Sequence, residues 1–300
     1  MTSRKPTACK AIPPAFRTIF FIVTCLLLLS LISFVFTQSF MSYSTPCTLH
    51  TVPAANSHET TTRFNQTLSP FICHALGKVG KVSISNTLEA FLLNYYKGCR
   101  TFEADFHQTS DGEFVVYHKG KAVGIDPSSF FGYPESGSHA DFMSSHMAGL
   151  TQLDMKGMVK LFLDFPDWLL VTDTKNDLKS LLTALCGALD EAGLNCVDRV
   201  IPQLYNFNDL EVAKSFGFTR TILTLYKMKV ENHKIIKFLE ANPEVIAVTF
   251  FPNRYPPLKK DLLRLGIKTF THTIDDPKDV LKFQEDGIYG VYTNSLCAGF

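Results

Sequence analysis

The chain has 300 residues and a mass of 33.6 kDa, with 46% hydrophobic residues, 19% charged residues and a net charge of +1. This composition is typical of globular proteins and excludes disordered and collagen-like chains. The charge is uneven, because Arg4, Lys5, Lys10 and Arg17 are the only charged side chains before Glu59. Removing these four from the 29 basic residues leaves 25 against 28 acidic ones, about −3, so no basic excess predicts a nucleic-acid partner.

Residues 18–37 are predicted to be a transmembrane signal anchor that follows a cytoplasmic tail, residues 1–17. The uncharged run 19–36 would span roughly 27 Å as a helix, close to the thickness of a bilayer's hydrocarbon core. Because every nearby positive charge precedes this run, the positive-inside rule places the rest of the chain across the membrane. A cleaved secretion signal is the alternative, although its apolar core is usually only about 7 to 15 residues long. We therefore expect a single-pass membrane protein with an extracytoplasmic domain.

Residues 38–69 are rich in Ser, Thr, Asn and Pro without periodicity, which predicts a solvated stalk. Six cysteines lie beyond the membrane segment: Cys47, Cys73, Cys99, Cys186, Cys196 and Cys297. They could pair in 15 ways, so the spacing does not predict their connectivity. Cys73 and Cys99 stand in apolar segments, where we expect buried free thiols.

Residues 70–300 alternate between predicted strands and helices. The strands are expected at 70–74, 100–106, 168–173, 200–204, 219–225, 245–251, 267–273 and 288–293. Helical periodicity recurs at 86–97, 154–165, 177–192, 208–216, 232–241, 258–265 and 277–285. Alternation indicates a parallel sheet, and eight units indicate an α/β protein with a closed (β/α)8 TIM-type barrel. A doubly wound open sheet is the alternative, but no G-x-G-x-x-G follows a strand. Asp111-Gly112 predicts an extra hairpin after the second strand.

Polar side chains gather at the predicted carboxyl ends of the first three strands, where the active sites of such barrels lie. His74 ends the first strand, Glu103 and Asp105 share one face of the second, and Asp173 and Lys175 share one face of the third. Carboxylates that face inward together repel each other unless a cation or a shared proton separates them. A divalent metal would resolve that repulsion, and an ion pair with a core Arg or Lys is the alternative.

A second histidine, His118, closes the predicted hairpin. With its neighbours it completes an ordered pattern: a His at the first strand, the helix start NTLEAF, an E-x-D strand, a T-x-D-G turn and a second His. This pattern, within residues 71–120, resembles the amino-terminal signature of the glycerophosphodiester phosphodiesterase family, which is part of the phosphatidylinositol phospholipase C-like superfamily. Weaker similarities in VTDTK, PQLYN, THTID and GVYTN extend the resemblance to about residue 295.

The resemblance implies a TIM barrel that hydrolyses phosphodiesters with a divalent cation, Ca²⁺ or Mg²⁺. Carried over by position, Glu103, Asp105 and Asp173 match metal ligands. His74 and His118 match the catalytic acid and base, and Lys175 matches a phosphate contact. The nucleophile is either a glycerol hydroxyl of the substrate or water. The expected substrate is a glycerophosphodiester or a (lyso)phospholipid head group at the membrane, and no motif identifies a protein partner.

Departures from the family pattern leave two other functions open. Ala75 stands where the family commonly has Arg, Lys119 where it has Asp, and His272 where it has an aromatic residue on the seventh strand. We expect His272 to contact substrate. The lost charges permit a non-catalytic barrel that binds a lipid, glycan or protein. The second alternative is a metal-independent enzyme like the inositol-lipid phospholipases C.

Three further residues are expected to bind substrate. Asn86 has two interpretations: it is either the N-cap of the first helix or a side chain that faces the site from the first loop. Gln203 and Tyr205 follow the fourth strand and are expected to line the pocket.

Overall fold

The computed structural model describes residues 67–118, 130–131, 137–147 and 149–299, which belong to one compact unit, Thr62–Phe300. The predicted cytoplasmic tail, the signal anchor and nearly all of the predicted stalk lie outside the described residues, as does Lys119. Within the described ranges, no helix is long and apolar enough to cross a membrane.

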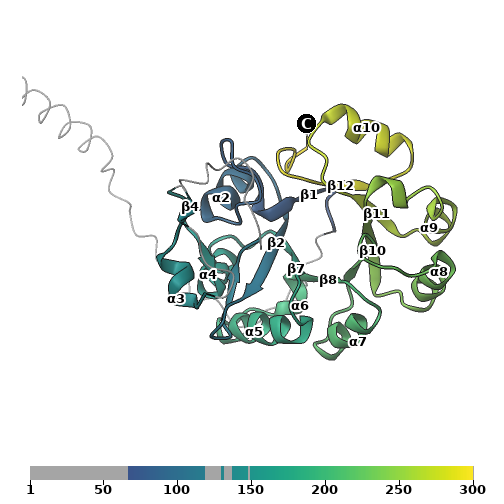
Figure 1. Ribbon diagram of the computed structural model, residues 1–300. Coiled ribbons are helices and arrows are strands. Elements are labelled where there is room, and N and C mark those ends of the chain that lie inside the picture. The colour runs from purple at the N-terminus through teal and green to yellow at the C-terminus, as the bar shows by residue number, and fades with distance from the viewer. Residues whose placement is uncertain (1–66, 119–129, 132–136, 148, 300) are drawn as a thin grey trace, which may run out of the picture. The chain divides into compact units, whose positions relative to one another are not determined.

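Eight parallel strands form a closed barrel (Figure 1). In chain order they are β1 (Phe71–Cys73), β2 (Thr101–Gln108), β7 (Leu169–Thr174), β8 (Val200–Leu204), β9 (Thr221–Thr224), β10 (Val245–Phe250), β11 (Lys268–Thr271) and β12 (Gly290–Thr293). Each pairs with its neighbours along the chain, and β1 closes the ring by pairing with both β12 and β2. The predicted TIM-type barrel is thus confirmed, and each of its eight strands overlaps a predicted one.

The helices lie around the outside of the ring of strands (Figure 1). They are α2 (Leu88–Tyr96), α4 (Met155–Asp164), α5 (Leu178–Glu191), α6 (Cys196–Arg199), α7 (Asn208–Ser215), α8 (Asn232–Ala241), α9 (Lys259–Leu265) and α10 (Pro277–Glu285). Several are preceded by an N-cap residue whose side chain accepts a hydrogen bond from a backbone amide of the first turn. Before α5, for example, the Asp177 side chain accepts from the Ser180 amide at 2.8 Å.

An insertion separates the second and third barrel strands. The predicted hairpin is present: β2 pairs antiparallel with β3 (Phe114–Val116) after a turn in which Gly112 has a φ of 91°. β3 then pairs with the short β6 (Leu153–Asp154). Between them lie β4 (Phe130–Phe131), α3 (His139–Ser144) and β5 (His146–Met147), with β4 and β5 paired antiparallel.

Apolar side chains fill one layer of the barrel interior. Seven strands contribute to it, through Ile72, Leu169, Val171, Ile201, Ile222, Ala247, Phe270 and Tyr292. Along β7, Asp173 comes two residues after Val171 and therefore points to the same side of the strand. The barrel thus changes from apolar to polar toward the carboxyl ends of its strands, which is where the predicted site residues gather.

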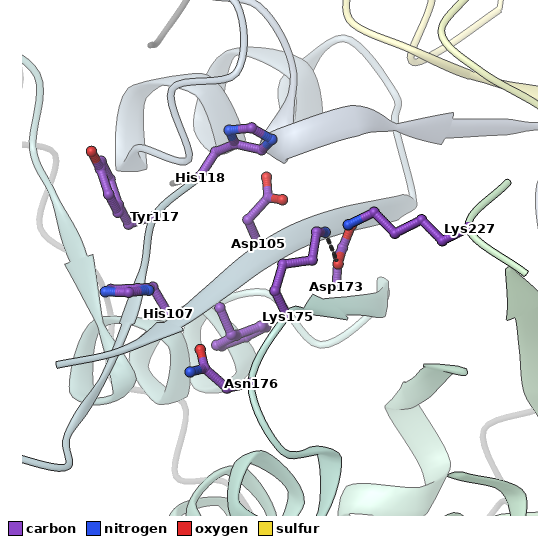
Figure 2. A pocket seen from close by; sticks show the side chains of 9 residues that line it. Asp105, His107, Tyr117, His118, Asp173, Lys175, Asn176 and Lys227 are labelled. Atoms are coloured by element: carbon purple, nitrogen blue, oxygen red, sulfur yellow. Dashed lines mark hydrogen bonds and ion pairs between the residues drawn. The ribbon is translucent and has the colours of Figure 1, made fainter. Parts of the chain in front are cut away.

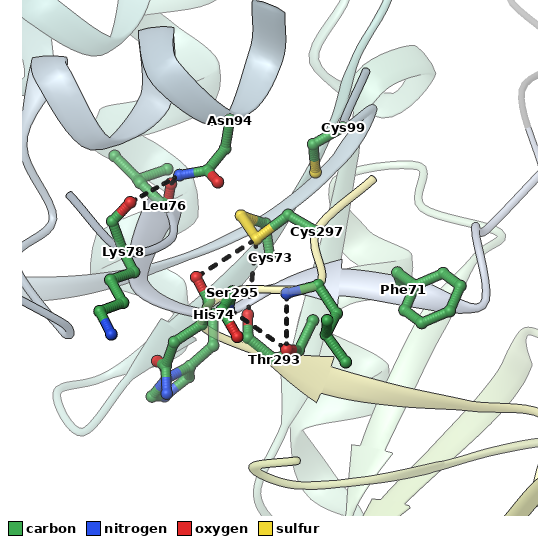
Figure 3. The surroundings of a disulfide bond; sticks show 12 residues. Phe71, Cys73, His74, Leu76, Lys78, Asn94, Cys99, Thr293, Ser295 and Cys297 are labelled. Atoms are coloured by element: carbon green, nitrogen blue, oxygen red, sulfur yellow. Dashed lines mark hydrogen bonds between the residues drawn. A yellow bond between two sulfur atoms is a disulfide. The ribbon is translucent and has the colours of Figure 1, made fainter. Parts of the chain in front are cut away.

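The described residues contain two disulfides, and one of them corrects a prediction. Cys73 at the end of β1 is bonded to Cys297, 224 residues later, whereas we expected a free thiol at Cys73 (Figure 3). Barrel closure brings β1 beside β12 and the segment after it, and cysteine spacing does not reveal that proximity. Cys186 pairs with Cys196, and Cys99 is a buried free thiol as predicted.

Candidate active site

Three carboxylates meet at the carboxyl end of the barrel. Glu103 and Asp105 come from β2 and Asp173 from β7, and the strand register pairs Asp105 directly with Asp173. One oxygen of each carboxylate lies within 4.8 Å of the other two. The residues are only 1%, 5% and 8% exposed, respectively. The structure therefore brings the three predicted metal ligands into one small, dry cluster.

The electrostatics of this cluster favour a bound cation. Burial, and then the charges of Asp105 and Asp173, raise the pKa of Glu103 well above its usual value. Burial and Asp173 likewise raise the pKa of Asp105. Oε2 of Glu103 accepts the Ala75 amide at 2.7 Å, while buried Oε1 has no hydrogen-bond partner among the described residues. Hard oxygen ligands with an orphaned buried oxygen are the donor set that Ca²⁺ or Mg²⁺ takes.

Asn86 faces this cluster and does not cap α2. Its Nδ2 donates to Oδ2 of Asp105 at 3.0 Å, and its Oδ1 accepts the Asp105 amide at 3.1 Å. Thr87, the next residue, is the N-cap and accepts the Ala90 amide. The N-cap interpretation of Asn86 is wrong because its backbone is left-handed, with a φ of 53°, and turns the side chain inward.

His74 is held in one orientation by a chain of hydrogen bonds. Its Nδ1 lies 2.9 Å from Oδ1 of Asn294, and Nδ2 of Asn294 donates to Asp275 at 2.8 Å. A carboxylate only accepts, so Asp275 fixes which end of the amide faces His74. The amide oxygen therefore accepts from Nδ1–H of His74, which leaves the lone pair of the neutral imidazole on Nε2.

His118 lies across the same cavity, just after β3. Its buried Nδ1 has no hydrogen-bond partner among the described residues. The cavity measures about 300 Å³ and is lined by both predicted catalytic histidines and the three carboxylates. Figure 2 shows His118 and Asp105 close together beside this mouth of the barrel.

Lys175 and Tyr205 both contact Asp173. Burial works against the charge of Lys175, but Asp173, to which its Nζ donates, raises the pKa of the amine. The Tyr205 hydroxyl also donates to Asp173, and it accepts from Lys175 at 2.9 Å. Nε2 of Gln203 donates to the same hydroxyl at 3.2 Å. The structure thus joins the predicted residues Lys175, Gln203 and Tyr205 to the carboxylate cluster.

The opposite side of the cavity is an aromatic wall, defined as Tyr226, Phe251, His272 and Tyr292. The ring of His272 lies 4.8 Å from that of Tyr226, 5.0 Å from Phe251 and 5.4 Å from Tyr292. Burial, and then His74, lower the pKa of His272 to about 4, so its ring is neutral at pH 7. Its buried Nε2 has no partner within the described part of the chain, so it can hydrogen-bond a ligand.

Sequence reasoning named His272 but missed other residues around the cavity. Tyr226 and Lys227 follow β9, Phe251 follows β10, and Asn294 follows β12. Their only sequence signal is a position at the end of a predicted strand or within two residues after it, where barrels place functional residues. Ala75 contributes its backbone amide alone, because its methyl group is fully buried.

Comparisons with known proteins identify the fold. No protein-family model matches the sequence, and no curated protein matches it. Among solved structures, an Oleispira antarctica phosphodiesterase in complex with its product sn-glycerol-3-phosphate has a TM-score of 0.61 at 16% identity, over 76% of this chain and 93% of that one. A Thermotoga maritima glycerophosphodiester phosphodiesterase has a TM-score of 0.53 at 17% identity, over 77% and 96%.

A Parabacteroides distasonis glycerophosphodiester phosphodiesterase has a TM-score of 0.56 at 15% identity and covers 75% of this chain and 92% of its own. The chain has the fold of the glycerophosphodiester phosphodiesterases. The resemblance seen in the sequence is confirmed at that level. In this glycerophosphodiesterase-type barrel, the predicted site residues stand at the mouth formed by the carboxyl ends of the strands.

Proposed function

We propose that this protein is a metal-dependent phosphodiesterase that hydrolyses glycerophosphodiesters or the head groups of (lyso)phospholipids. The observation that carries the proposal is the cavity where three buried carboxylates, one with an orphaned oxygen, face two histidines. The fold supports it, because structures of similar fold include a phosphodiesterase with bound glycerol phosphate. The predicted anchor would hold the barrel beside a bilayer, which favours the lipid substrates.

The residues present fit a divalent cation. Glu103, Asp105 and Asp173 would hold it, because their crowding raises the pKa of the first two and a cation relieves that repulsion. A bound Ca²⁺ or Mg²⁺ would supply Lewis-acid stabilisation of the charge on the phosphoryl oxygens. Lys175, whose ammonium faces the same cavity, adds a second positive charge for those oxygens.

His74 is suited to act as the general base. Its Nδ1–H is committed to Asn294, so Nε2 is free to take the proton of the attacking hydroxyl. The attacking hydroxyl belongs either to the substrate's glycerol or to water. Asp275 completes the chain by orienting Asn294.

His118 is suited to act as the general acid. In its protonated form it would donate to the departing alkoxide, and its charge lowers the pKa of neighbouring Asp105. The two histidines lie on different elements that flank one cavity, so one can act on the nucleophile while the other acts on the leaving group.

The test is release of glycerol phosphate or free head group, with and without EDTA. Activity should require added Ca²⁺ or Mg²⁺, and Asp105→Asn should lose it. Glu211→Gln, which removes an exposed carboxylate on α7, is the matched control and should be unaffected. Hydrolysis that persists in EDTA would favour the metal-independent alternative. Complete absence of hydrolysis with glycerol phosphate still bound would favour the non-catalytic alternative.

We also propose that residues 18–37 anchor the protein with its barrel outside the cytoplasm. The uncharged run, the preceding positive charges and two disulfides in the barrel support this location. Carbonate extraction of membranes and protease treatment of intact cells provide the test. An anchored barrel stays in the pellet and is cleaved from outside, whereas release of a shortened soluble form would indicate a cleaved signal.

A further inference from the structure

Lys227 lies where three cavities of the barrel mouth meet. The catalytic cavity of about 300 Å³ and two flanking cavities of about 390 and 350 Å³ are all lined by Lys175 and Lys227. Lys227 follows β9, on the far side of the mouth from β2. Figure 2 shows its side chain extending toward Asp173 and Lys175, so that two amines from different strands converge on one point.

The two lysines differ in the groups that contact their amines. Lys175 donates to Asp173 and to the Tyr205 hydroxyl. Lys227 makes no ion pair or hydrogen bond within the described residues, and its amine lies over the rings of Tyr205 and Tyr226, at 5.5 and 5.7 Å from their centres. Partial burial and then the charge of Lys175 lower the pKa of Lys227, while Asp173 raises it. Two converging ammonium groups repel each other unless an anion lies between them.

The charges of the loaded site favour an anion. Three carboxylates, a divalent cation and Lys175 sum to zero, from −3, +2 and +1. Lys227, together with His118 in the protonated form that the proposed mechanism requires, then makes the mouth +2. A phosphodiester carries a single negative charge and lowers this excess to +1, which favours its binding in a partly dry cavity.

We propose that Lys227 binds the non-bridging phosphate oxygens of the substrate. This inference rests on the proposed function and names a residue that determines substrate affinity. Lys227 acts as a point charge on a flexible stem, which suits a tetrahedral oxyanion without demanding fixed geometry. It does not transfer a proton, so its contribution falls on substrate binding.

The test compares three variants of the full chain in detergent with Ca²⁺. Lys227→Met removes the charge, Lys227→Arg keeps it, and Lys229→Met removes an exposed charge two residues away that lines none of the three cavities. The substrates are glycerophosphoglycerol, whose only charge is the phosphate, and glycerophosphoserine, which adds a carboxylate and an ammonium group. We expect Lys227→Met to raise KM about tenfold for both and to change kcat less than about threefold. Lys227→Arg should stay within about threefold of the wild type, and Lys229→Met should match it.

Two kinetic results would overturn the assignment. One is a KM for Lys227→Met equal to that of Lys229→Met. The other is a rise in KM confined to glycerophosphoserine, which would place Lys227 at the leaving group.

Calorimetric binding of sn-glycerol 3-phosphate separates this inference from the proposed function. If the protein binds glycerol phosphate without hydrolysing diesters, and Lys227→Met weakens that binding about tenfold, the inference stands and the enzymatic proposal fails. Absence of both binding and hydrolysis would overturn both.

Discussion

The two sides of the barrel mouth are built on different principles. The side formed by β1, β2 and β7 presents buried carboxylates, each tied to backbone or side-chain donors such as the Ala75 amide and Asn86. The opposite side, formed after β9, β10 and β11 and on β12, presents the aromatic wall and a lysine with no ionic partner among the described residues. The first side is buried and carries negative charge, which suits a cation. The second is apolar with one free charge, which suits an organic phosphate.

Removing Glu103 should have the largest effect on the difference between the two sides of the mouth. Glu103→Gln takes away a predicted metal ligand, and activity should fall on the order of 10⁴-fold because a metal contributes several kcal/mol to phosphoryl transfer. The raised pKa of Glu103 means that its stabilising contribution is present at low pH and lost as pH rises through that pKa. At pH 7 the metal-free variant should therefore melt above the metal-free wild type. Calorimetry should also show that Ca²⁺ no longer raises its melting temperature, and a lower melting temperature would contradict the electrostatic account.

Removing either histidine should nearly abolish turnover while leaving the metal side intact. His74→Asn and His118→Asn should each lower kcat about 10³-fold, the usual worth of a general acid or base. The Ca²⁺-induced rise in melting temperature should persist in both. His233→Asn, an exposed histidine that lines none of the mouth cavities, is the control. Turnover that survives both changes would exclude acid–base catalysis by this pair.

The aromatic wall should make stability depend on pH through His272. Its folded pKa of about 4 lies below the usual value of 6.5, so the unfolded chain binds more protons in that window. The neutral ring's contribution is complete above pH 6.5 and is lost as pH falls toward 4. Between pH 7 and pH 5 this amounts to about 2 kcal/mol. Denaturant unfolding of His272→Phe should show a pH dependence that is smaller by this amount, and an unchanged pH dependence would show that folding does not lower the pKa of the His272 ring.

Asn294 should show the smallest of these effects, because it acts through His74. Asn294→Ala frees the imidazole to adopt the other tautomer, and we expect kcat to fall about tenfold, or about 1.4 kcal/mol. Asn294→Asp keeps an acceptor for Nδ1–H of His74 and should recover part of the lost kcat, although it no longer donates to Asp275. Equal kcat values for Asn294→Ala and Asn294→Asp would mean that Asn294 has only a structural role.

The barrel and the carboxylate side of its mouth could be predicted because both follow repeating patterns in the sequence. Each strand is a short apolar or β-branched run between helical patterns, and Glu103 and Asp105 alternate along one such run. The hairpin could be predicted from Asp111-Gly112 for a different reason, because its turn signal is local in the sequence.

The opposite side and the covalent links could not be predicted, because they depend on closure in three dimensions. Tyr226, Lys227 and Phe251 are single residues in different loops, and no spacing relates them until the strands form a ring. Asn86 had two interpretations because a left-handed backbone at a non-glycine residue has no reliable sequence signal. Cys73 looked like a core thiol because its partner lies at the other end of the chain.

The disulfide between Cys73 and Cys297 closes the barrel covalently. It joins the first strand to the segment after the last one, one residue from His74 and three from Asn294. A protease that cuts anywhere between the two cysteines would open the polypeptide without dividing the molecule. Such a nicked protein would run as one band on a non-reducing gel and as two after reduction. His74, the proposed base, and Asn294, which orients it, would stay linked after such a cut. We therefore expect the nicked protein to keep activity until its disulfide is reduced.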